Sequence, residues 1–457
     1  MSIVKVVSEG LAHFSYFVAN EGTAFVIDPR RDCDIYLDLA RNAGVQITRI
    51  FETHRNEDYV VGSLELFERT GAEIFHGPGL EWGYGTTLSD DQRFRLGGTN
   101  LIAMHTPGHT EESMSYVLCD DSSGPDAVAI FTGDALFAGE VGRTDLLGRD
   151  HTERMAGALY DSIHKNILTL GDGVIVFPAH GAGSVCGSDI SEREFTTVGI
   201  EKKSSPLLRL NRADFIDHKV QERLDRPPYF FRMESMNLSS RQAMTGLPDP
   251  RPLRPKKFAE ARSSGAIIVD TRTPESFAGA HIEGSESIWM AGLAPYAGWL
   301  LPHDVPLLLV LDDPEHVETA VRTLIRMGYD NITGYLWGGM VQWCHDNMPF
   351  KTMRTASVGE LKTKLDAKER VIVLDPRPFH EWVKVHLTEA NNIFVGELEK
   401  NLAKVPKDRP IASMCSVGYR GSMAAAILER NGYDNVMNVL GGVSAWAAAG
   451  YPVVKGK

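Results

Sequence analysis

Cysteine is scarce in this chain, with five residues among 457 and no CxxC pair. An odd, sparse set in a chain of this length indicates reduced thiols and excludes a disulfide framework. We therefore expect a reducing compartment, the cytoplasm. The first segment alternates apolar and polar residues and lacks the basic and apolar regions of a signal peptide, so we expect it to form the first strands of a sheet.

Long apolar runs and an excess of basic residues are also missing. No apolar run reaches the length that spans a bilayer, so we expect no membrane segment. The 60 acidic residues outnumber the 47 basic ones, which argues against nucleic acid or an anionic membrane surface as the main partner. The hydrophobic fraction of 43% is that of a globular protein, and the length predicts two to four domains.

The N-terminal half contains short β-rich runs such as "GTAFVIDP" and "AVAIFTGDALF", separated by helical stretches. These runs end in His, Asp or Gly, which places polar side chains at one rim of the sheets, where sites form. We predict a first domain over residues 1–245. The segment 246–257 carries four prolines without an apolar period, which predicts a linker.

After this segment the sequence repeats itself. "IIVDTRTPESFAGAHIEG" and "VIVLDPRPFHEWVKVHLTE" each contain an Asp, an Arg and a His, with eleven positions from Asp to His in both copies. Strand-like runs alternate with helices in each copy, which predicts two doubly wound parallel α/β domains, at 258–350 and 355–457.

Four candidate metal ligands follow probable strands of the first domain. They are His54 in "THRNEDY", His109 in "HTPGHT", Asp134 in "FTGDALF" and His180 in "FPAHG". Imidazole and carboxylate groups at strand ends are what a catalytic transition-metal site needs.

This half, residues 1 to about 240, resembles the metallo-β-lactamase superfamily and, within it, the glyoxalase II and persulfide dioxygenase branch. The family signature is THxHxDH, and here Asn56 and Tyr59 stand where two histidines belong. A dinuclear hydrolytic site needs both histidines, so we expect the second metal to be absent. The resemblance implies one Fe(II) per chain on His54, His109 and Asp134, with coordination positions open for O2 and a sulfur substrate.

The same resemblance suggests roles for neighbouring residues. Asp58 and Asp145 are not expected to bind the metal themselves, but to orient the residues that do. Arg143 either holds a persulfide or carboxylate beside the iron or forms a structural salt bridge. His180 is expected to orient a ligand or face the substrate.

Cys186 follows His180 in the glycine-rich segment "PAHGAGSVCGS". We predict an exposed, flexible thiol that swings toward the iron and accepts a sulfane sulfur. The alternative is a small loop residue without a role.

The strongest local motif is "IASMCSVGYRGSMAAAILERNGY", a buried strand, a six-residue loop and an Ala-rich helix. Loop amides that converge at a helix N-terminus form an anion cradle and favour a thiolate. Cys415 is therefore predicted to carry a persulfide, with Arg420 adding a fixed cation. The rest of the cradle is the substrate-binding set Ser416, Val417, Gly418 and Tyr419. The alternative is an inert buried cysteine.

This motif resembles the rhodanese family, and the resemblance covers residues 355–457. The related phosphatases use a loop one residue longer than the six-residue loop found here. In the first copy, Leu311 stands at the position of Cys415 and His316 at that of Arg420. That copy is therefore predicted to be inactive and structural.

End to end, the chain resembles the multidomain persulfide dioxygenase–rhodanese fusions. The resemblance implies an N-terminal αββα sandwich followed by two rhodanese domains. It also implies oxidation of a low-molecular-weight thiol persulfide by O2 to sulfite, and transfer of a sulfane sulfur onto sulfite to give thiosulfate. Coenzyme A, bacillithiol and glutathione stay open as the carrier thiol, and we expect a homo-oligomer. Two alternatives are a glyoxalase II-like thioester hydrolase fused to a sulfurtransferase and a non-catalytic persulfide carrier.

Overall fold

The computed structural model describes residues 1–122, 124, 126–187, 189–193 and 195–456. The chain divides into two compact units, Met1–Leu247 with Ile325–Gly328, and Pro248–Leu324 with Tyr329–Lys457. Within the described part of the chain, no helix has both the length and the apolar character needed to cross a membrane.

The first unit contains two six-stranded sheets. The first sheet has the order β1-β2-β3-β4-β5-β6 and the second the order β12-β11-β10-β9-β8-β7. The strands are β1 (Ser2–Ser8), β2 (His13–Asn20), β3 (Thr23–Ile27), β4 (Gln46–Phe51), β5 (Glu73–His76), β6 (Thr86–Thr87), β7 (Arg93–Leu96), β8 (Thr99–His105), β9 (Met114–Asp120), β10 (Ala127–Gly133), β11 (Ile175–Pro178) and β12 (Thr196–Thr197). The helices are α1 (Asp34–Ala43), α2 (Ser63–Thr70), α3 (Arg149–Asp161), α4 (Val198–Ser204), α5 (Arg212–Gln221) and α6 (Phe230–Leu238).

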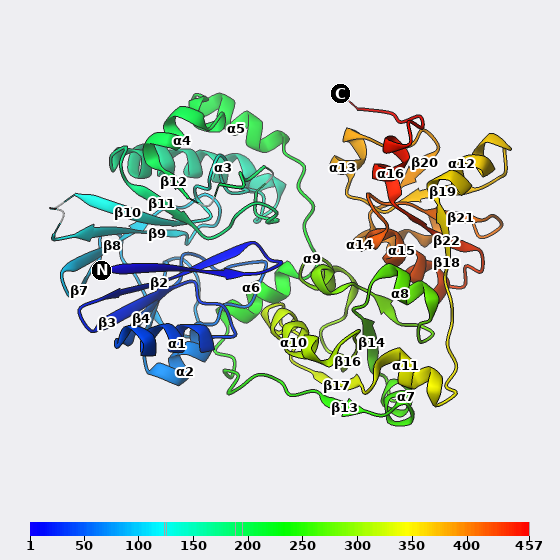
Figure 1. Ribbon diagram of the computed structural model, residues 1–457. Helices are drawn as coiled ribbons and strands as arrows, with labels where there is room; N and C mark the ends of the chain where they lie inside the picture. Colours follow the sequence, from blue (N-terminus) through cyan, green and yellow to red (C-terminus); the bar gives the residue numbers. More distant parts are fainter. Residues whose placement is uncertain (123, 125, 188, 194, 457) are drawn as a thin grey trace. The chain divides into compact units, whose positions relative to one another are not determined.

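Three hydrophobic clusters explain how these sheets and helices stack. One cluster joins the two sheets and contains Phe51 and Phe131. A second packs α1 and α2 on the outer face of the first sheet, through Tyr36 and Leu66. The third packs α3 on the outer face of the second sheet, through Leu159. The central strands are apolar on both faces because both are covered (Figure 1). The predicted αββα sandwich is confirmed.

The second unit contains two five-stranded sheets with the same topology. Their orders are β13-β17-β16-β14-β15 and β18-β22-β21-β19-β20, with parallel pairing throughout. The strands are β13 (Arg251–Leu253), β14 (Ile267–Asp270), β15 (Glu286–Ser287), β16 (Leu307–Val310), β17 (Ile332–Leu336), β18 (Arg354–Ser357), β19 (Ile372–Asp375), β20 (Ala390–Asn392), β21 (Ile411–Ser413) and β22 (Val436–Leu440). The predicted pair of doubly wound domains is confirmed.

The helices of this unit alternate with its strands. They are α7 (Pro255–Ser263), α8 (Pro274–Gly279), α9 (Leu293–Leu300), α10 (Val317–Arg326), α11 (Gly339–His345), α12 (Val358–Asp366), α13 (Phe379–Lys384), α14 (Val395–Leu398), α15 (Tyr419–Arg430) and α16 (Gly442–Ala448).

The segment 246–257 is only partly a linker. Arg251–Leu253 forms the edge strand β13, which pairs in parallel with β17, and α7 begins at Pro255. An edge strand tolerates Pro252 because one side of it has no ladder partner to lose, and proline favours the first turn of a helix. The prolines of this segment favoured a linker in the sequence analysis, although the central domain already begins within it.

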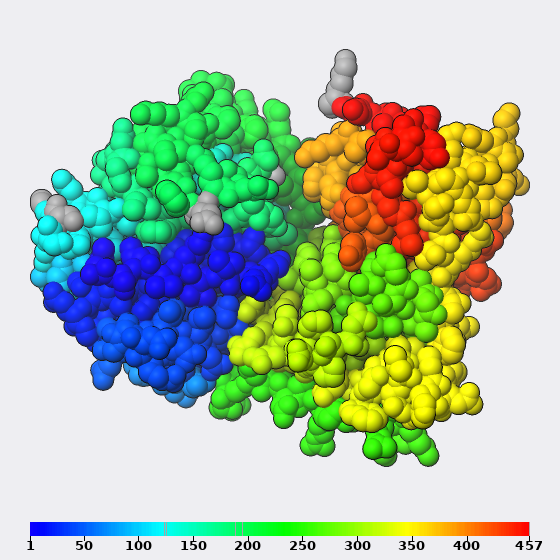
Figure 2. Space-filling view, viewed as in Figure 1, coloured from blue at the N-terminus to red at the C-terminus, as the bar shows by residue number. Residues whose placement is uncertain are grey.

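The two rhodanese-type copies share a hydrophobic core. Phe277 and Ala278 of the central copy belong to the same cluster as Met423 and Ile427 of α15. In Figure 2 the central copy is coloured from green to yellow and the C-terminal copy from yellow to red.

Candidate metal centre and sulfur-transfer loop

The strand ends of the first unit bring the predicted ligands together. His54 follows β4, His109 lies in the loop between β8 and β9, and Asp134 follows β10 directly. Asp134 Oδ2 lies 3.8 Å from His54 Nε2 and 3.5 Å from His109 Nε2. All three atoms are buried and have no hydrogen-bond partner among the described residues. Converging buried donors of this kind fit a transition-metal ion.

The opposite nitrogen of each imidazole has a partner that fixes its orientation. His54 Nδ1 lies 2.9 Å from Thr53 Oγ1, and the Thr53 hydroxyl donates to Asp28 at 2.6 Å. His109 Nδ1 donates to the carbonyl of Arg143 at 2.9 Å. With Nδ1 protonated, each ring presents Nε2 as a lone-pair donor, which is the usual arrangement of metal-binding histidines.

The electrostatics of the cluster also suit a cation. Burial lowers the pKa of His54 to about 4, so the ring is neutral and able to act as a ligand. Burial acts to raise the pKa of Asp134, but His180 and the other imidazoles outweigh it and lower the pKa to about 2. For His109 burial acts to lower the pKa, and Glu57 outweighs it, so the pKa rises to about 9. An ionised carboxylate beside the neutral His54 ring offers donors to a divalent metal, and a metal that binds His109 Nε2 has to displace a proton from that ring.

His180 and Asp58 form a chain behind Asp134. His180 Nδ1 lies 2.7 Å from Asp134 Oδ1, and His180 Nε2 lies 3.1 Å from Asp58 Oδ2. Both ring nitrogens therefore contact carboxylates. These contacts agree with the first role expected for His180, which is to orient a ligand. The second role, contact with the substrate, stays a prediction.

Arg143, which is buried, forms an ion pair with the partly exposed Asp145. The guanidinium donates to both Asp145 oxygens, at 2.7 and 2.9 Å, and to the carbonyls of Val185 and Asp225. Of the two predicted roles, the structure shows the salt bridge. The Arg143 backbone also joins the site, because its N–H donates to Cys186 O and its carbonyl accepts from His109.

Cys186 differs from the exposed thiol that the sequence predicted. Its side chain is 0% exposed, and its Sγ lies 3.4 Å from Glu57 Oε1. Burial raises the pKa of the thiol, and Asp58, Glu57 and Asp134 raise it further. The glycines nearby did not produce exposure because Cys186 packs with Phe137 and Ile190 in a small core. The thiol nevertheless faces the metal cluster.

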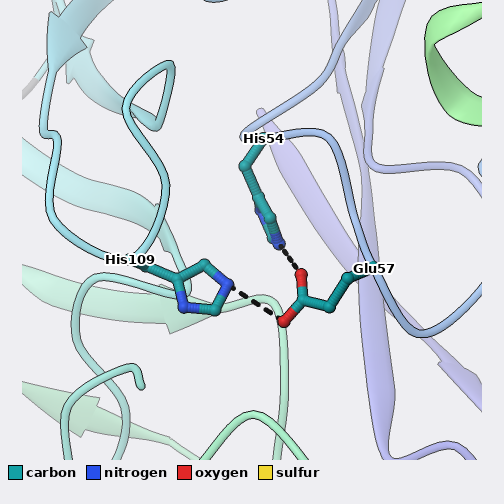
Figure 3. A group of neighbouring side chains, drawn as sticks. All are labelled: His54, Glu57 and His109. Atoms are coloured by element: carbon teal, nitrogen blue, oxygen red, sulfur yellow. Dashed lines mark ion pairs between the residues drawn. The ribbon is translucent and has the colours of Figure 1, made fainter. Parts of the chain in front are cut away.

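Sequence reasoning missed Glu57, which occupies a variable position of the signature. Its carboxylate points between the two imidazoles, with Oε1 3.3 Å from His109 Nε2 and Oε2 3.8 Å from His54 Nε2 (Figure 3). His54, Glu57 and His109 form one potential ion-binding group, and Asp58, His180 and Cys186 form another. The sequence feature that could have pointed to Glu57 is its position directly before Asp58, the Asp of the signature.

The two substituted signature positions have local partners. Asn56 donates from Nδ2 to the His54 carbonyl at 3.0 Å. Tyr59 stacks on His13 with ring centroids 3.9 Å apart. An amide and a phenol at these positions replace the imidazole donors of a second metal.

In the C-terminal domain, Cys415 lies between β21 and the N-terminus of α15 and is 1% exposed. The Gly418 N–H donates to Cys415 Sγ at 3.1 Å. Gly418 has φ 123°, a conformation that favours glycine and turns this amide toward the sulfur. Val417 and Tyr419 are exposed at the rim.

Arg420 is held by a residue that sequence reasoning missed. Glu381 of α13 accepts from Arg420 Nη1 at 2.5 Å and from Nη2 at 2.8 Å, and Ser416 Oγ accepts from Nη2 at 2.9 Å. The predicted cation is present, and its charge is paired with a carboxylate. Because this charge is paired, we expect backbone amides such as the Gly418 N–H to be the main anion-binding groups of the loop.

The central copy contributes aromatic side chains beside this loop. Trp289 lies 4.9 Å from Tyr419 and 5.5 Å from Tyr296, between ring centroids. Tyr296 lies near Arg420, and burial raises the pKa of Tyr296, so the hydroxyl keeps its proton. Leu311, at the position of the nucleophile, is buried and aliphatic.

Comparison with known proteins gives the class of each part. Residues 9–180 match the metallo-beta-lactamase superfamily, and residues 254–346 and 357–449 match the rhodanese-like domain. The chain is therefore a fusion of a metallo-beta-lactamase domain with two rhodanese domains. The candidate metal centre lies in the first domain, and the Cys415 loop lies in the second rhodanese domain.

Individual relatives cover the first domain or more. The mitochondrial persulfide dioxygenase ETHE1 of Bos taurus is 28% identical over 214 residues, which are 45% of this chain and 73% of that protein. Hydroxyacylglutathione hydrolase GloC of Haemophilus influenzae is 26% identical over 211 residues, 41% of this chain and 89% of that protein. A solved metallo-beta-lactamase structure from Staphylococcus aureus is 28% identical and covers 74% of this chain and 99% of its own, with a TM-score of 0.66.

Proposed function

We propose that this protein is a non-haem Fe(II) persulfide dioxygenase coupled to a sulfurtransferase. The first reaction is RSSH + O2 + H2O → RSH + SO3²⁻ + 2 H⁺, in which the sulfane sulfur is oxidised and O2 is reduced. The observation that carries the proposal is the convergence of His54, His109 and Asp134 with Asn56 and Tyr59 at the positions of two missing histidines. Two imidazoles and one carboxylate are the donor set of mononuclear iron oxygenases.

The chain's own residues would hold and shape this centre. His54 and His109 present Nε2, and Asp134 presents Oδ2 while its Oδ1 stays bonded to His180. The bound Fe(II) would supply redox chemistry with O2 and a binding position for the persulfide sulfur. Burial excludes bulk water and keeps the donors ordered.

The second reaction takes place at Cys415. A sulfane sulfur moves from RSSH to the Cys415 thiolate, forming the Cys415 S–S bond and releasing the thiol. The step Cys415–S–S⁻ + SO3²⁻ → Cys415–S⁻ + S2O3²⁻ then breaks that bond and regenerates the thiolate. The Gly418 N–H, 3.1 Å from Sγ, supports stabilisation of the sulfur anion.

Small acidic or neutral persulfides, O2 and sulfite are the partners of this proposal, with coenzyme A, bacillithiol or glutathione as the carrier. Five free cysteines support a reducing compartment, the cytoplasm, and we expect a homo-oligomer. Oxygen uptake by the iron-loaded full chain with a thiol persulfide tests the first reaction. Uptake of one O2 for each molecule of sulfite plus thiosulfate formed supports it, and an inert iron-loaded protein contradicts it.

A glyoxalase II-like thioester hydrolase is the second candidate, favoured by the similarity to hydroxyacylglutathione hydrolase GloC. That chemistry uses two metals, whereas the dioxygenase needs one. Metal analysis with a thioester assay separates the two functions, and a protein with neither metal nor activity would be a persulfide carrier.

A further inference from the structure

We infer that Glu57 is a fourth protein ligand of the metal held by His54, His109 and Asp134. The inference rests on the proposed metal centre and holds whichever reaction that centre catalyses.

The position of the Glu57 carboxylate is the first observation. Its side chain is 1% exposed, and its two oxygens lie 3.3 Å from His109 Nε2 and 3.8 Å from His54 Nε2. The dashed contacts of Figure 3 show the carboxylate directed into the space between the two rings. Glu57 and Asp134 also offer oxygens within 4.8 Å of each other.

The spacing of the donors is the second observation. Metal bonds of about 2.1 Å directed toward the corners of a tetrahedron put neighbouring ligand atoms roughly 3.4 Å apart. The measured separations from Glu57 and Asp134 to the two imidazoles run from 3.3 to 3.8 Å. One ion at the centre of these four groups would therefore contact all of them without a large rearrangement.

The unmet bonding capacity of the carboxylate is the third observation. Glu57 Oε2 is buried and has no hydrogen-bond partner among the described residues, as is true of His54 Nε2, His109 Nε2 and Asp134 Oδ2. The other oxygen, Oε1, accepts a weak S–H bond from Cys186 at 3.4 Å and lies 3.3 Å from His109 Nε2. A buried carboxylate oxygen without a hydrogen bond is costly, and coordination to a cation removes that cost.

Four protein ligands change what the centre can accommodate. A fourth protein ligand fills one coordination position that the three-ligand set leaves open. Two carboxylates also neutralise a divalent ion, which favours retention of Fe(II) between turnovers.

Titration of the metal-free full chain with Co(II) tests the inference, because Co(II) binding is read from its visible absorption without any activity. Glu57→Gln keeps the shape and removes the anionic donor. We expect weaker binding by at least the ~10–100-fold that loss of an outer partner costs, with an altered visible spectrum. Glu112→Gln is the matched control, since Glu112 is buried nearby and accepts from the Arg55 N–H at 3.1 Å outside the cluster.

Equal affinity and an unchanged spectrum in folded Glu57→Gln would overturn the inference. If that variant does not fold, a crystal structure of the Co(II)-loaded natural chain decides. A Glu57 oxygen within about 2.2 Å of the ion supports the fourth ligand, and a carboxylate turned away contradicts it. Either failure leaves the proposed reaction intact, because oxygen uptake tests that separately.

Discussion

The Nδ1 atom of His180 lies 2.7 Å from the Oδ1 atom of Asp134. This contact occupies one carboxylate oxygen and leaves Oδ2 facing His54 and His109. In the proposed metal centre, His180 would therefore orient Asp134 as a ligand.

Replacement of His180 by Ala should weaken metal binding without abolishing it. We expect a ~10–100-fold loss of affinity, because Asp134 loses the partner that fixes its orientation. Competition with a coloured chelator measures the affinity. His105→Ala is the control, since the His105 ring bonds the Glu111 carbonyl away from the cluster. Equal affinity in both variants would contradict the orienting role.

Replacement of Cys415 by Ser should separate the two reactions. The hydroxyl cannot carry a sulfane sulfur, so we expect thiosulfate formation to fall to background while oxygen uptake continues and sulfite accumulates. Cys344→Ser is the matched control, because Cys344 is exposed and lies in the central copy. Enzymatic thiosulfate at the natural rate from the Cys415 variant would exclude Cys415 as the carrier.

Cys186, whose thiol faces the metal cluster, is predicted to accept a sulfane sulfur from substrate and pass it on to the Cys415 site; we call this the relay. Transfer from RSSH would give RSH and a Cys186 persulfide, which alkylation and mass spectrometry detect after substrate addition. We expect Cys186→Ser to lower the ratio of thiosulfate to sulfite while iron content is retained. Because the thiol is buried and its pKa is raised, transfer requires the segment around it to open. An unchanged product ratio and no trapped persulfide would leave the relay without support.

The central copy should affect sulfur transfer through Tyr296 and not through His316. Tyr296→Phe removes the hydroxyl near Arg420, and we expect a ~10-fold slower transfer with unchanged oxygen uptake. His316→Ala should change stability more than turnover, since it adjoins no nucleophile. Sulfur-transfer rates and thermal unfolding of both variants measure this. Equal transfer rates in the two would show that the central copy is only structural.

The sequence predicted most of the fold and the positions of the candidate ligands, because both follow from local patterns. His54 and Asp134 come after apolar runs that became β4 and β10, and the ends of neighbouring strands meet at one rim of the sheets. The repeat of Asp270 and Asp375 predicted two domains with one topology.

Other features depend on the directions of side chains, which spacing does not encode. Glu57 reaches the two imidazoles because the loop turns at Asn56, whose φ is 21°. Glu381 reaches Arg420 from a helix 39 positions earlier in the chain. The packing of Cys186 against Phe137 likewise arises from tertiary contacts.

Oxygen uptake combined with iron analysis tests the central claim most directly. The full chain, purified with its metal and supplied with a low-molecular-weight thiol persulfide, should contain one iron per chain and consume one O2 for each molecule of sulfite plus thiosulfate formed. It should lose both iron and uptake in His54→Ala. Two equivalents of zinc in the active protein, with thioester hydrolysis and no oxygen uptake, would contradict the account.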